Sequence, residues 1–226
     1  MIITIDGPAA AGKGTLAVAL AQKYHLAYFD TGMVYRATGL QMLLNNEDPN
    51  DGPAALKHAM ALTFPQMMAL SQNKEFRSSQ NGQYASIVSA FPAVRAALLK
   101  MQQDFAKNPV FADGSKASGA VYDGRDTGTV ICPQADIKFF LTATLEVRAG
   151  RRFKEFQEKG FDTPYETVYN DIKARDERDS SRKDAPLKPA DDAIVLDSTE
   201  WTIERMVEEG CKIVERRKLA EIATSL

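Results

Sequence analysis

The sequence predicts an α/β fold in which a five-stranded parallel sheet is flanked by helices. Short apolar runs alternate with helical patterns along the chain, which is typical of a parallel sheet covered on both faces. The first run, residues 2–5, is apolar on both faces, as expected of a buried central strand. With 226 residues and 44% hydrophobic residues, the chain can bury one substantial core. We therefore expect a single domain over residues 1–226.

A glycine-bracketed loop follows the first strand. Residues 7–15 read GPAAAGKGT, and the alanine-rich stretch Leu16–Tyr24 after them has a helical composition. In a strand–loop–helix unit with G-x-x-x-x-G-K spacing, backbone N–H groups and the helix N-terminus face phosphate oxygens, and the lysine reaches the outer phosphates. A glycine-rich connection without a ligand is the alternative interpretation. We prefer a nucleoside triphosphate site, and call residues 7–15 the phosphate loop.

Four further apolar runs are the remaining strand candidates. They are, in chain order, Leu26–Asp30, Gly119–Asp123, Ile137–Thr142 and Ala193–Asp197. Three of them end in aspartate, and ligands of open α/β sheets bind beyond the carboxyl ends of the strands. We therefore expect these aspartates, together with Asp6, beside the phosphate loop. For Asp30 and Asp197, capping of the following turn is an equally good interpretation.

One segment fits this alternation poorly. Residues from Asn45 to about Phe91 are rich in Asn, Gln, Ser and Pro, which indicates an inserted lobe. Between the lobe and the third strand, the run 110–114 (VFADG) competes with 120–124 (AVYDG) for the strand position. We favour the second run because it places Arg125 and Asp126 at a strand end. Substrate specificity is expected in the inserted lobe.

Two arginines follow strands in glycine-containing turns. The motif DTGMVYR ends in Arg36, one turn into a predicted helix, within reach of a second anion. The motif DGRDTG places Arg125 and Asp126 at the end of another strand. Taken alone, Arg36 is by default a surface residue, and Arg125 beside Asp126 is often a local ion pair.

Two groups of arginines recur at helical spacing. One contains Arg175, Arg178 and Arg182 with Asp179 beside them, and the other is the set 148, 151 and 152. Solvated helix faces often carry such charges. In a chain with a triphosphate loop, however, convergent Arg and Lys residues with Mg²⁺ are the equipment that phosphoryl transfer requires. The pattern thus favours a phosphotransferase.

Composition excludes several classes of protein. The 28 basic and 30 acidic residues give a net charge of −2, which argues against an extended nucleic-acid footprint. Cys132 and Cys211 are far apart and have no ligand-spaced His or Cys, so neither zinc nor a disulfide framework is indicated. No run approaches the length of a membrane span, and the start of the chain has no signal pattern. We expect a cytoplasmic enzyme.

The motifs resemble those of bacterial cytidylate kinases, in order and over nearly the whole chain. They are GPAAAGKGT, DTGMVYR, YASIVSAFPAVRAALLKMQ, DGRDTGTVICPQADIKFFLTAT, RAGRRFKE and RDERDSSRKDAPLKPADDAIVLDST. The resemblance implies transfer of a phosphoryl group from ATP to CMP or dCMP with Mg²⁺, by a chain that is typically a monomer. It also implies a P-loop core with an inserted monophosphate-binding lobe, here about 45–91, and a short lid, about 150–165.

The resemblance also assigns roles to individual residues. It gives ATP the loop residues Gly7, Pro8, Ala9, Ala10, Ala11, Gly12, Lys13, Gly14 and Thr15, with Arg148 and Arg152 from the lid. Thr15 is the candidate Mg²⁺ ligand. It implies that the CMP phosphate is bound by Thr31, Arg36, Arg125 and Arg182. The cytosine ring would be bound by Ser86, Arg95 and Asp126, and the sugar by Arg175 and Asp179. The catalytic set is Lys13, Arg125, Arg152 and Arg182.

Two departures from the family pattern and two alternatives remain. Residues 62–83 are short and lack the β-hairpin pattern that the family shows there, and residues 110–119 look inserted. The acceptor could be another small molecule such as UMP, or the chain could sense nucleotides without turnover.

No side chain is needed as a general base, because a phosphate oxygen of CMP is already ionised at neutral pH.

Overall fold

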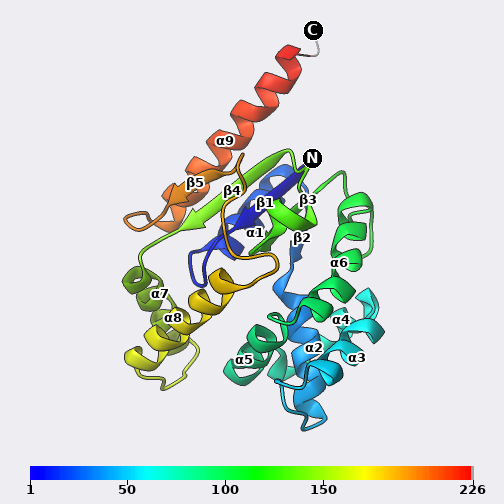
Figure 1. Cartoon of the computed structure of the whole chain (residues 1–226). Helices are drawn as coiled ribbons and strands as arrows, with labels where there is room; N and C mark the ends of the chain where they lie inside the picture. The colour runs from blue at the N-terminus through cyan, green and yellow to red at the C-terminus, as the bar shows by residue number, and fades with distance from the viewer. Residues whose placement is uncertain (225–226) are drawn as a thin grey trace. The chain divides into compact units, whose positions relative to one another are not determined.

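Residues 1–224, which the computed structural model describes, contain one five-stranded parallel sheet (Figure 1). Its strands are β1 (Ile2–Asp6), β2 (Ala27–Asp30), β3 (Ala120–Gly124), β4 (Ile137–Thr142) and β5 (Ile194–Asp197). Their order in the sheet is β2-β3-β1-β4-β5, so the first strand is central, as predicted. The five predicted strands are confirmed, β4 with its predicted bounds and the others within one residue. AVYDG, rather than VFADG, forms β3.

The strand register places the functional segments at the carboxyl ends of the central strands. Asp6, the last residue of β1, lies opposite Gly124 of β3 and Phe140 of β4. The carboxyl ends of β1 and β3 are therefore level, β4 continues two residues further to Thr142, and the phosphate loop begins beside it. The strands that follow β1 along the chain lie on both sides of it, so the strand order reverses at β1. The carboxyl ends of the strands at such a switch point are the usual ligand position in open α/β sheets.

The chain divides into two compact units. The first comprises Met1–Phe29 and the chain from Pro109 onward, and it contains the sheet except for the last residue of β2. The second comprises Asp30–Asn108 and contains the segment 45–91 within it.

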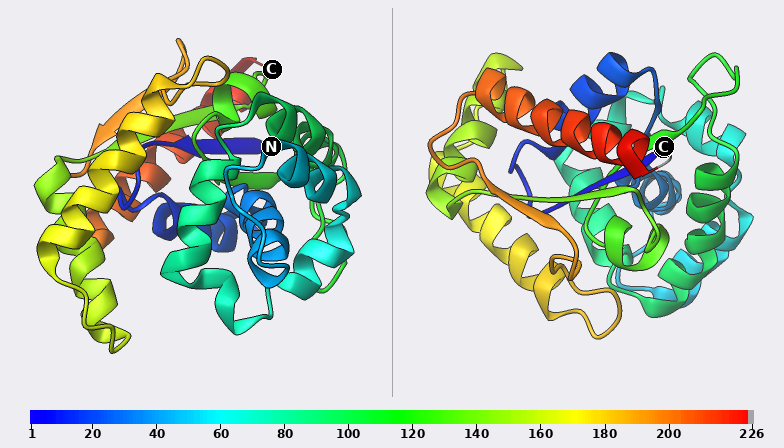
Figure 2. Two further views of the ribbon diagram at one scale, coloured as in Figure 1. Left: turned by 60° about the horizontal axis from the view of Figure 1, so that its bottom comes forward. Right: turned by 90° about the horizontal axis from the view of Figure 1, so that it is seen from above.

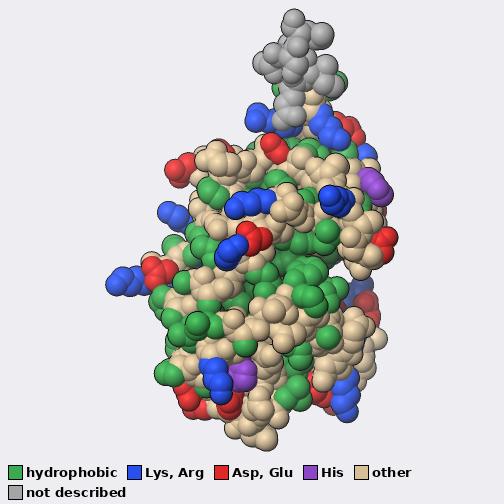
Figure 3. All heavy atoms as spheres, turned by 90° about the vertical axis from the view of Figure 1, so that its right-hand side faces the viewer, with side chains coloured by type: hydrophobic (Ala, Val, Ile, Leu, Met, Phe, Trp, Pro, Cys, Tyr) green, Lys and Arg blue, Asp and Glu red, His purple; other side chains and the backbone are tan. Residues whose placement is uncertain are grey.

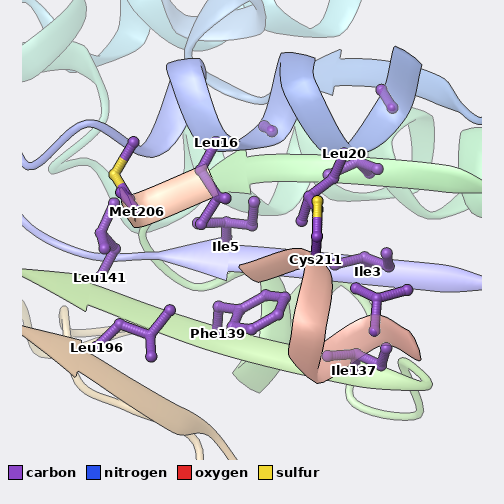
Figure 4. Packing of buried hydrophobic residues seen from close by; sticks show 14 of the residues in the cluster. Ile3, Ile5, Leu16, Leu20, Ile137, Phe139, Leu141, Leu196, Met206 and Cys211 are labelled. Carbon is purple, nitrogen blue, oxygen red and sulfur yellow. The ribbon is translucent and has the colours of Figure 1, made fainter. Parts of the chain in front are cut away.

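One face of the sheet is covered by α1 (Lys13–Tyr24) and α9 (Ile203–Thr224), as Figure 4 shows. Because side chains alternate along a strand, Ile3 and Ile5 of β1 both point to this face. There they pack with Leu16 of α1, Phe139 of β4 and Met206 of α9, and all five are at most 3% exposed. This cluster holds α1, and with it the end of the phosphate loop, against the sheet.

The opposite face of β1 carries Thr4 and Asp6 and lies against η2 (Thr127–Ile131), one π-helical turn after β3. Thr4 is fully buried there, and a Cβ on Gly128 would lie only 2.9 Å from its Oγ1 atom. The polar residues of this strand thus face the DGRDTG segment, so the two motifs are packed together.

Two helices, α7 (Leu145–Glu158) and α8 (Tyr165–Ser181), form a hairpin after β4 and lie side by side in Figure 2. Val168 and Ile172 of α8 pack with Ala149 of α7 and with Ala9 of the phosphate loop. The connection between the helices falls in the predicted lid, residues 150–165, whose role as a lid stays a prediction.

The second unit is helical throughout its described length after β2. Its elements are α2 (Gly32–Leu44), α3 (Gly52–Ala61), α4 (Phe64–Leu70), η1 (Lys74–Arg77, a 3-10 turn), α5 (Ser79–Val88) and α6 (Pro92–Lys107). Asp51 and Thr63 cap the amino ends of α3 and α4. Helices α2 and α5 approach closely at Gly39, where a Cβ would lie 3.0 Å from the Ala85 backbone nitrogen. Residues 62–83 form helical turns rather than a hairpin.

Charged side chains are interspersed on the surface that Figure 3 draws, with lysines and arginines next to acidic residues. This pattern agrees with the net charge of −2. Among the residues that the structure describes, no helix is both long and apolar enough to cross a membrane.

Candidate active site

The phosphate loop adopts a conformation that its glycines allow. At Gly7, a Cβ would lie 1.9 Å from the Leu141 carbonyl oxygen, so any side chain would collide with β4. Gly12, the residue before α1, has a φ of +97°, which side chains disfavour. The loop therefore turns tightly over the end of β4 and enters α1 at Lys13, with the N–H groups of the first helical turn at its end.

Lys13 is buried under this loop. Its Nζ atom donates to the Pro8 carbonyl oxygen at 2.8 Å, and the residue is 6% exposed. Burial, together with the positive charge of Arg125, lowers the pKa of Lys13 to about 7. The negative charges of Asp123 and Asp6 offset this lowering only in part. The Lys13 side chain is thus held where an added phosphate charge would favour its protonated form.

Asp6 fixes the segment that carries Arg125 and Asp126. Its Oδ1 atom accepts from the N–H and hydroxyl of Thr127, and its Oδ2 atom accepts from the N–H of Gly128, each at 2.8 Å. Burial raises the pKa of Asp6 despite these bonds. The position of Asp6 at the strand end was predicted, whereas its role as an anchor for η2 was not.

Three predicted site arginines gather at the buried carboxylate of Asp179. Arg125 Nε donates to its Oδ2 atom at 2.9 Å, Arg182 donates to Oδ1, and Arg175 Nε lies 3.9 Å from Oδ2. Burial alone would raise the pKa of Asp179, but the arginines outweigh burial and lower it. Likewise, burial alone would lower the pKa of Arg125, whereas Asp179 and Asp123 raise it.

The second arginine group does not converge as the first does. Arg148 is 6% exposed and contacts the phosphate loop through the Ala9 carbonyl oxygen, at 3.1 Å. Arg151 donates to Ser198, and Arg152 donates to Glu155 at 2.7 Å. Of these three arginines, Arg148 therefore contacts the loop, whereas these hydrogen bonds hold Arg151 and Arg152 elsewhere.

In the second unit, Thr31 and Arg36 belong to the start of α2. Thr31 is the N-terminal cap residue of α2 and is 3% exposed. Arg36 Nη1 donates to the Phe76 carbonyl oxygen at 3.2 Å, and Asn81 of α5 donates to the Arg36 carbonyl oxygen at 3.1 Å. The contact of α2 with η1 thus fixes the side chain of Arg36, and its contact with α5 fixes the backbone.

Ser86 and Arg95 are brought together within the second unit. Arg95 Nη1 donates to the Ser89 carbonyl oxygen at 3.2 Å, and the Ser89 hydroxyl donates to the Ser86 carbonyl oxygen at 2.9 Å. The Arg95 guanidinium lies 5.4 Å from the centre of the Tyr35 ring. Ser86 is 3% and Arg95 is 9% exposed, so both are buried polar residues. Their sequence neighbourhoods carry no signal for this.

The oxygen donors near the end of the phosphate loop fit Mg²⁺. Thr15 is exposed there, and the Asp123 Oδ2 atom lies 3.2 Å from where a Cβ on Gly14 would be. Within residues 1–224, no group of three or more His, Cys, Asp or Glu residues is placed to hold a metal. Mg²⁺ at kinase sites takes one or two carboxylates and keeps water and phosphate ligands, so such a group is not needed.

Comparison with known proteins agrees with this geometry. The chain is 46% identical over 217 residues to a cytidylate kinase of Rhodospirillum rubrum, covering 96% of this chain and 98% of the relative. It is 50% identical over 199 residues to a cytidylate kinase of Paramagnetospirillum magneticum, covering 88% and 90%. A solved structure of an uncharacterised protein from Eubacterium ventriosum shares the fold, with a TM-score of 0.50, 12% identity and coverage of 96% and 98%.

The family model described as cytidylate kinase matches residues 3–216, which include every predicted site residue. The chain belongs to the cytidylate kinase family.

Proposed function

We propose that this chain transfers the γ-phosphoryl group of ATP to CMP or dCMP, giving ADP and CDP or dCDP. The observation that carries the proposal is the placement of Lys13 beneath the phosphate loop, within the electrostatic field of Arg125. Arg125 is itself held with Arg182 on one buried carboxylate. Preorganised positive charge of this kind stabilises a migrating phosphoryl group.

The reaction needs alignment and charge neutralisation more than proton transfer. A phosphate oxygen of CMP attacks the γ-phosphorus of ATP, a new O–P bond forms, and the bond to the β-phosphate oxygen breaks with ADP as the leaving group. The attacking oxygen is already ionised, so no general base is required. Lys13 and the arginines neutralise charge on the migrating group.

We assign the remaining roles as the family resemblance gives them. The phosphate loop binds the triphosphate of ATP, with Arg148 and Arg152 as further candidates. Thr31, Arg36, Arg125 and Arg182 bind the CMP phosphate, while Ser86, Arg95 and Asp126 bind cytosine and Arg175 and Asp179 the sugar. The resemblance gives Thr15 to Mg²⁺. We add Asp123 because its carboxylate lies beside Gly14, and Mg²⁺ bound there would neutralise phosphate charge.

The organisation of the chain is part of the same proposal. We assign monophosphate binding to the lobe at about 45–91 and a lid function to about 150–165, within one kinase domain. The enzyme acts as a cytoplasmic monomer that requires neither nucleic acid nor a membrane.

The activity is tested directly by following products. Purified protein incubated with ATP, Mg²⁺ and CMP is expected to yield CDP and ADP in equal amounts by ³¹P NMR, and none without CMP. Release of inorganic phosphate in place of CDP would refute the assignment of CMP as acceptor.

ATP binding is expected to take up a proton at Lys13 above neutral pH. The pKa of Lys13 is about 7 in the free chain, so the side chain is largely neutral at pH 8. Phosphate charge favours the ammonium and raises its pKa on binding, which requires a proton from the buffer. Apparent ATP affinity should therefore fall as pH rises above about 7. Titration calorimetry at pH 8 in two buffers of different ionisation enthalpy measures the uptake, and identical heats in both would contradict it.

Replacement of Asp179 by alanine is expected to destabilise the fold and weaken CMP binding. Removing the carboxylate leaves Arg125 and Arg182 without it, and breaking a buried ion pair costs about 3–5 kcal/mol. Denaturant unfolding and the KM values for CMP and dCMP check both effects. A larger loss with CMP than with dCMP supports the sugar contact, whereas unchanged kinetics with both would contradict the assignment.

A further inference from the structure

We propose that Asp176 is a positioning residue that, through Arg148, holds the phosphate loop in the conformation that binds ATP. The inference concerns the donor site and rests on the proposed function. Asp176 lies on α8 and Arg148 on α7, and neither the loop motif nor the family resemblance assigned a role to Asp176.

The two side chains bind the loop at Ala9, one through its backbone N–H and the other through its carbonyl oxygen. Asp176 Oδ1 accepts from the Ala9 N–H at 3.3 Å, and Arg148 Nη1 donates to the Ala9 carbonyl oxygen at 3.1 Å. The same Nη1 donates to Asp176 Oδ2 at 2.5 Å. Both backbone polar groups of Ala9 are thus held by one ion pair. We call Asp176, Arg148 and Ala9 the loop clasp.

Burial makes the clasp a fixed part of the fold. The Arg148 side chain is 8% exposed and that of Asp176 is 20% exposed. Arg148 Nε also donates to the Ala143 carbonyl oxygen at 2.8 Å, just after β4. The guanidinium therefore connects the end of the sheet, helix α8 and the loop. A surface pair would be screened and weak, but a pair with this burial is costly to break.

The loop has a conformational reason to need the clasp. Ala10, the next residue, has a φ of +59°, in the left-handed region that non-glycine residues rarely adopt. Such a residue persists only where its surroundings hold it, and strain of this kind concentrates at ligand-binding sites. Two fixed hydrogen bonds at the preceding residue supply that restraint. Without them, the loop must be ordered by ATP itself, and affinity falls.

The opposite effect of Asp176 is also chemically possible. Its carboxylate accepts hydrogen bonds from an N–H of the phosphate loop and from an arginine, as a phosphate would. If the triphosphate displaces Asp176, the carboxylate competes with ATP and its removal tightens binding. Arg148 is buried and donates to the carbonyl oxygens of Ala143 and Ala9. Because these bonds fix its guanidinium beside Asp176, we favour the clasp. The two possibilities predict changes of opposite sign in the ATP dissociation constant.

The test is D176N, which keeps the size of the side chain and removes its charge. Losing a charged hydrogen bond predicts an ATP Kd raised about tenfold to a hundredfold in calorimetry. The CMP Kd, and kcat at saturating ATP, should each change by less than about threefold, which corresponds to well under the free energy of one charged hydrogen bond. An ATP Kd that is unchanged or lowered would overturn the clasp, as would equal losses for ATP and CMP. If D176N does not fold, D176E provides the test, because its retained charge predicts a smaller loss.

Two comparisons make the result specific. D171N removes an exposed carboxylate from the same helix and should leave the ATP Kd unchanged. Because Asp176 and Arg148 act on one residue, D176N with R148Q should weaken ATP binding no more than the worse single variant. Multiplied losses would overturn the shared role. If D176N behaves as expected but the parent forms no CDP, the proposed function fails while the clasp stands. If the parent forms CDP and D176N binds ATP normally, the clasp alone fails.

Discussion

Replacing Lys13 with alanine is expected to lower kcat by about a hundredfold or more, the scale of losing one preorganised electrostatic group. The ammonium lies at the phosphate loop, with Nζ 2.8 Å from the Pro8 carbonyl oxygen. Charge on the migrating phosphoryl group would then develop without this partner. Single-turnover and steady-state rates with ATP and CMP measure the loss.

Two variants separate this effect from damage to the fold. Lys23→Ala removes an exposed lysine from the other end of α1, where it pairs with Glu215 at the surface, and should leave kcat unchanged. Because the folded pKa of Lys13 is below its ordinary value, the unfolded chain binds more protons between about pH 7 and 10.5. The contribution of Lys13 to stability therefore rises with pH over that window, and Lys13→Met should remove that contribution from the measured pH dependence. A Lys13→Ala kcat within threefold of the parent would contradict the catalytic role.

Replacing Asp126 with alanine is expected to lower kcat/KM for CMP by about tenfold to a hundredfold or more, and that for UMP by clearly less. Cytosine presents an N4 amino donor where uracil presents an O4 acceptor, so the two bases differ in polarity and hardly in shape. A carboxylate can only accept, and would therefore bind the cytosine amino group and repel the uracil oxygen. Asp126 is 5% exposed, so solvent does little to offset a wrong pairing.

The ratio of the two losses decides the interpretation of Asp126. Its carbonyl oxygen accepts from the N–H groups of Val130 and Ile131, so the backbone of this residue also supports η2. Alanine keeps those backbone bonds, which isolates the side chain. If kcat/KM falls by the same factor for CMP and UMP, Asp126 supports the turn and does not select the base.

The strands and the phosphate loop could be predicted because their signals are local. The continuous run of β-branched residues in β1 and the fixed glycine spacing after it depend only on near neighbours, and β4 matched its predicted bounds. Even here, the predicted stripe of Arg175, Arg178 and Arg182 needed correction. Helix α8 ends at Ser181, so Arg182 follows the helix, and Arg178 is exposed. Arg175 and Arg182 nevertheless both lie at Asp179, because its negative carboxylate offsets the repulsion between the two guanidinium groups.

The partners of the buried charges could not be predicted, because they lie far along the chain. Arg125 meets Asp179 across 54 positions, and Arg148 meets the Ala9 carbonyl oxygen across 139. No periodic pattern encodes such pairs, which form only when the sheet brings the strand ends together. Ser86 and Arg95 show the same limit, since their link through Ser89 depends on how α5 and α6 pack. The sequence around them reads as ordinary helix.

Substrate choice is the most direct test of the whole account. The measurement is kcat/KM for ADP release with ATP and Mg²⁺ and, in turn, CMP, dCMP, UMP and AMP as acceptor. We predict that CMP and dCMP are the preferred acceptors and that UMP and AMP are clearly poorer, because the base site selects by polarity. Preference for UMP or AMP, or ADP release at the same rate without any acceptor, would contradict it.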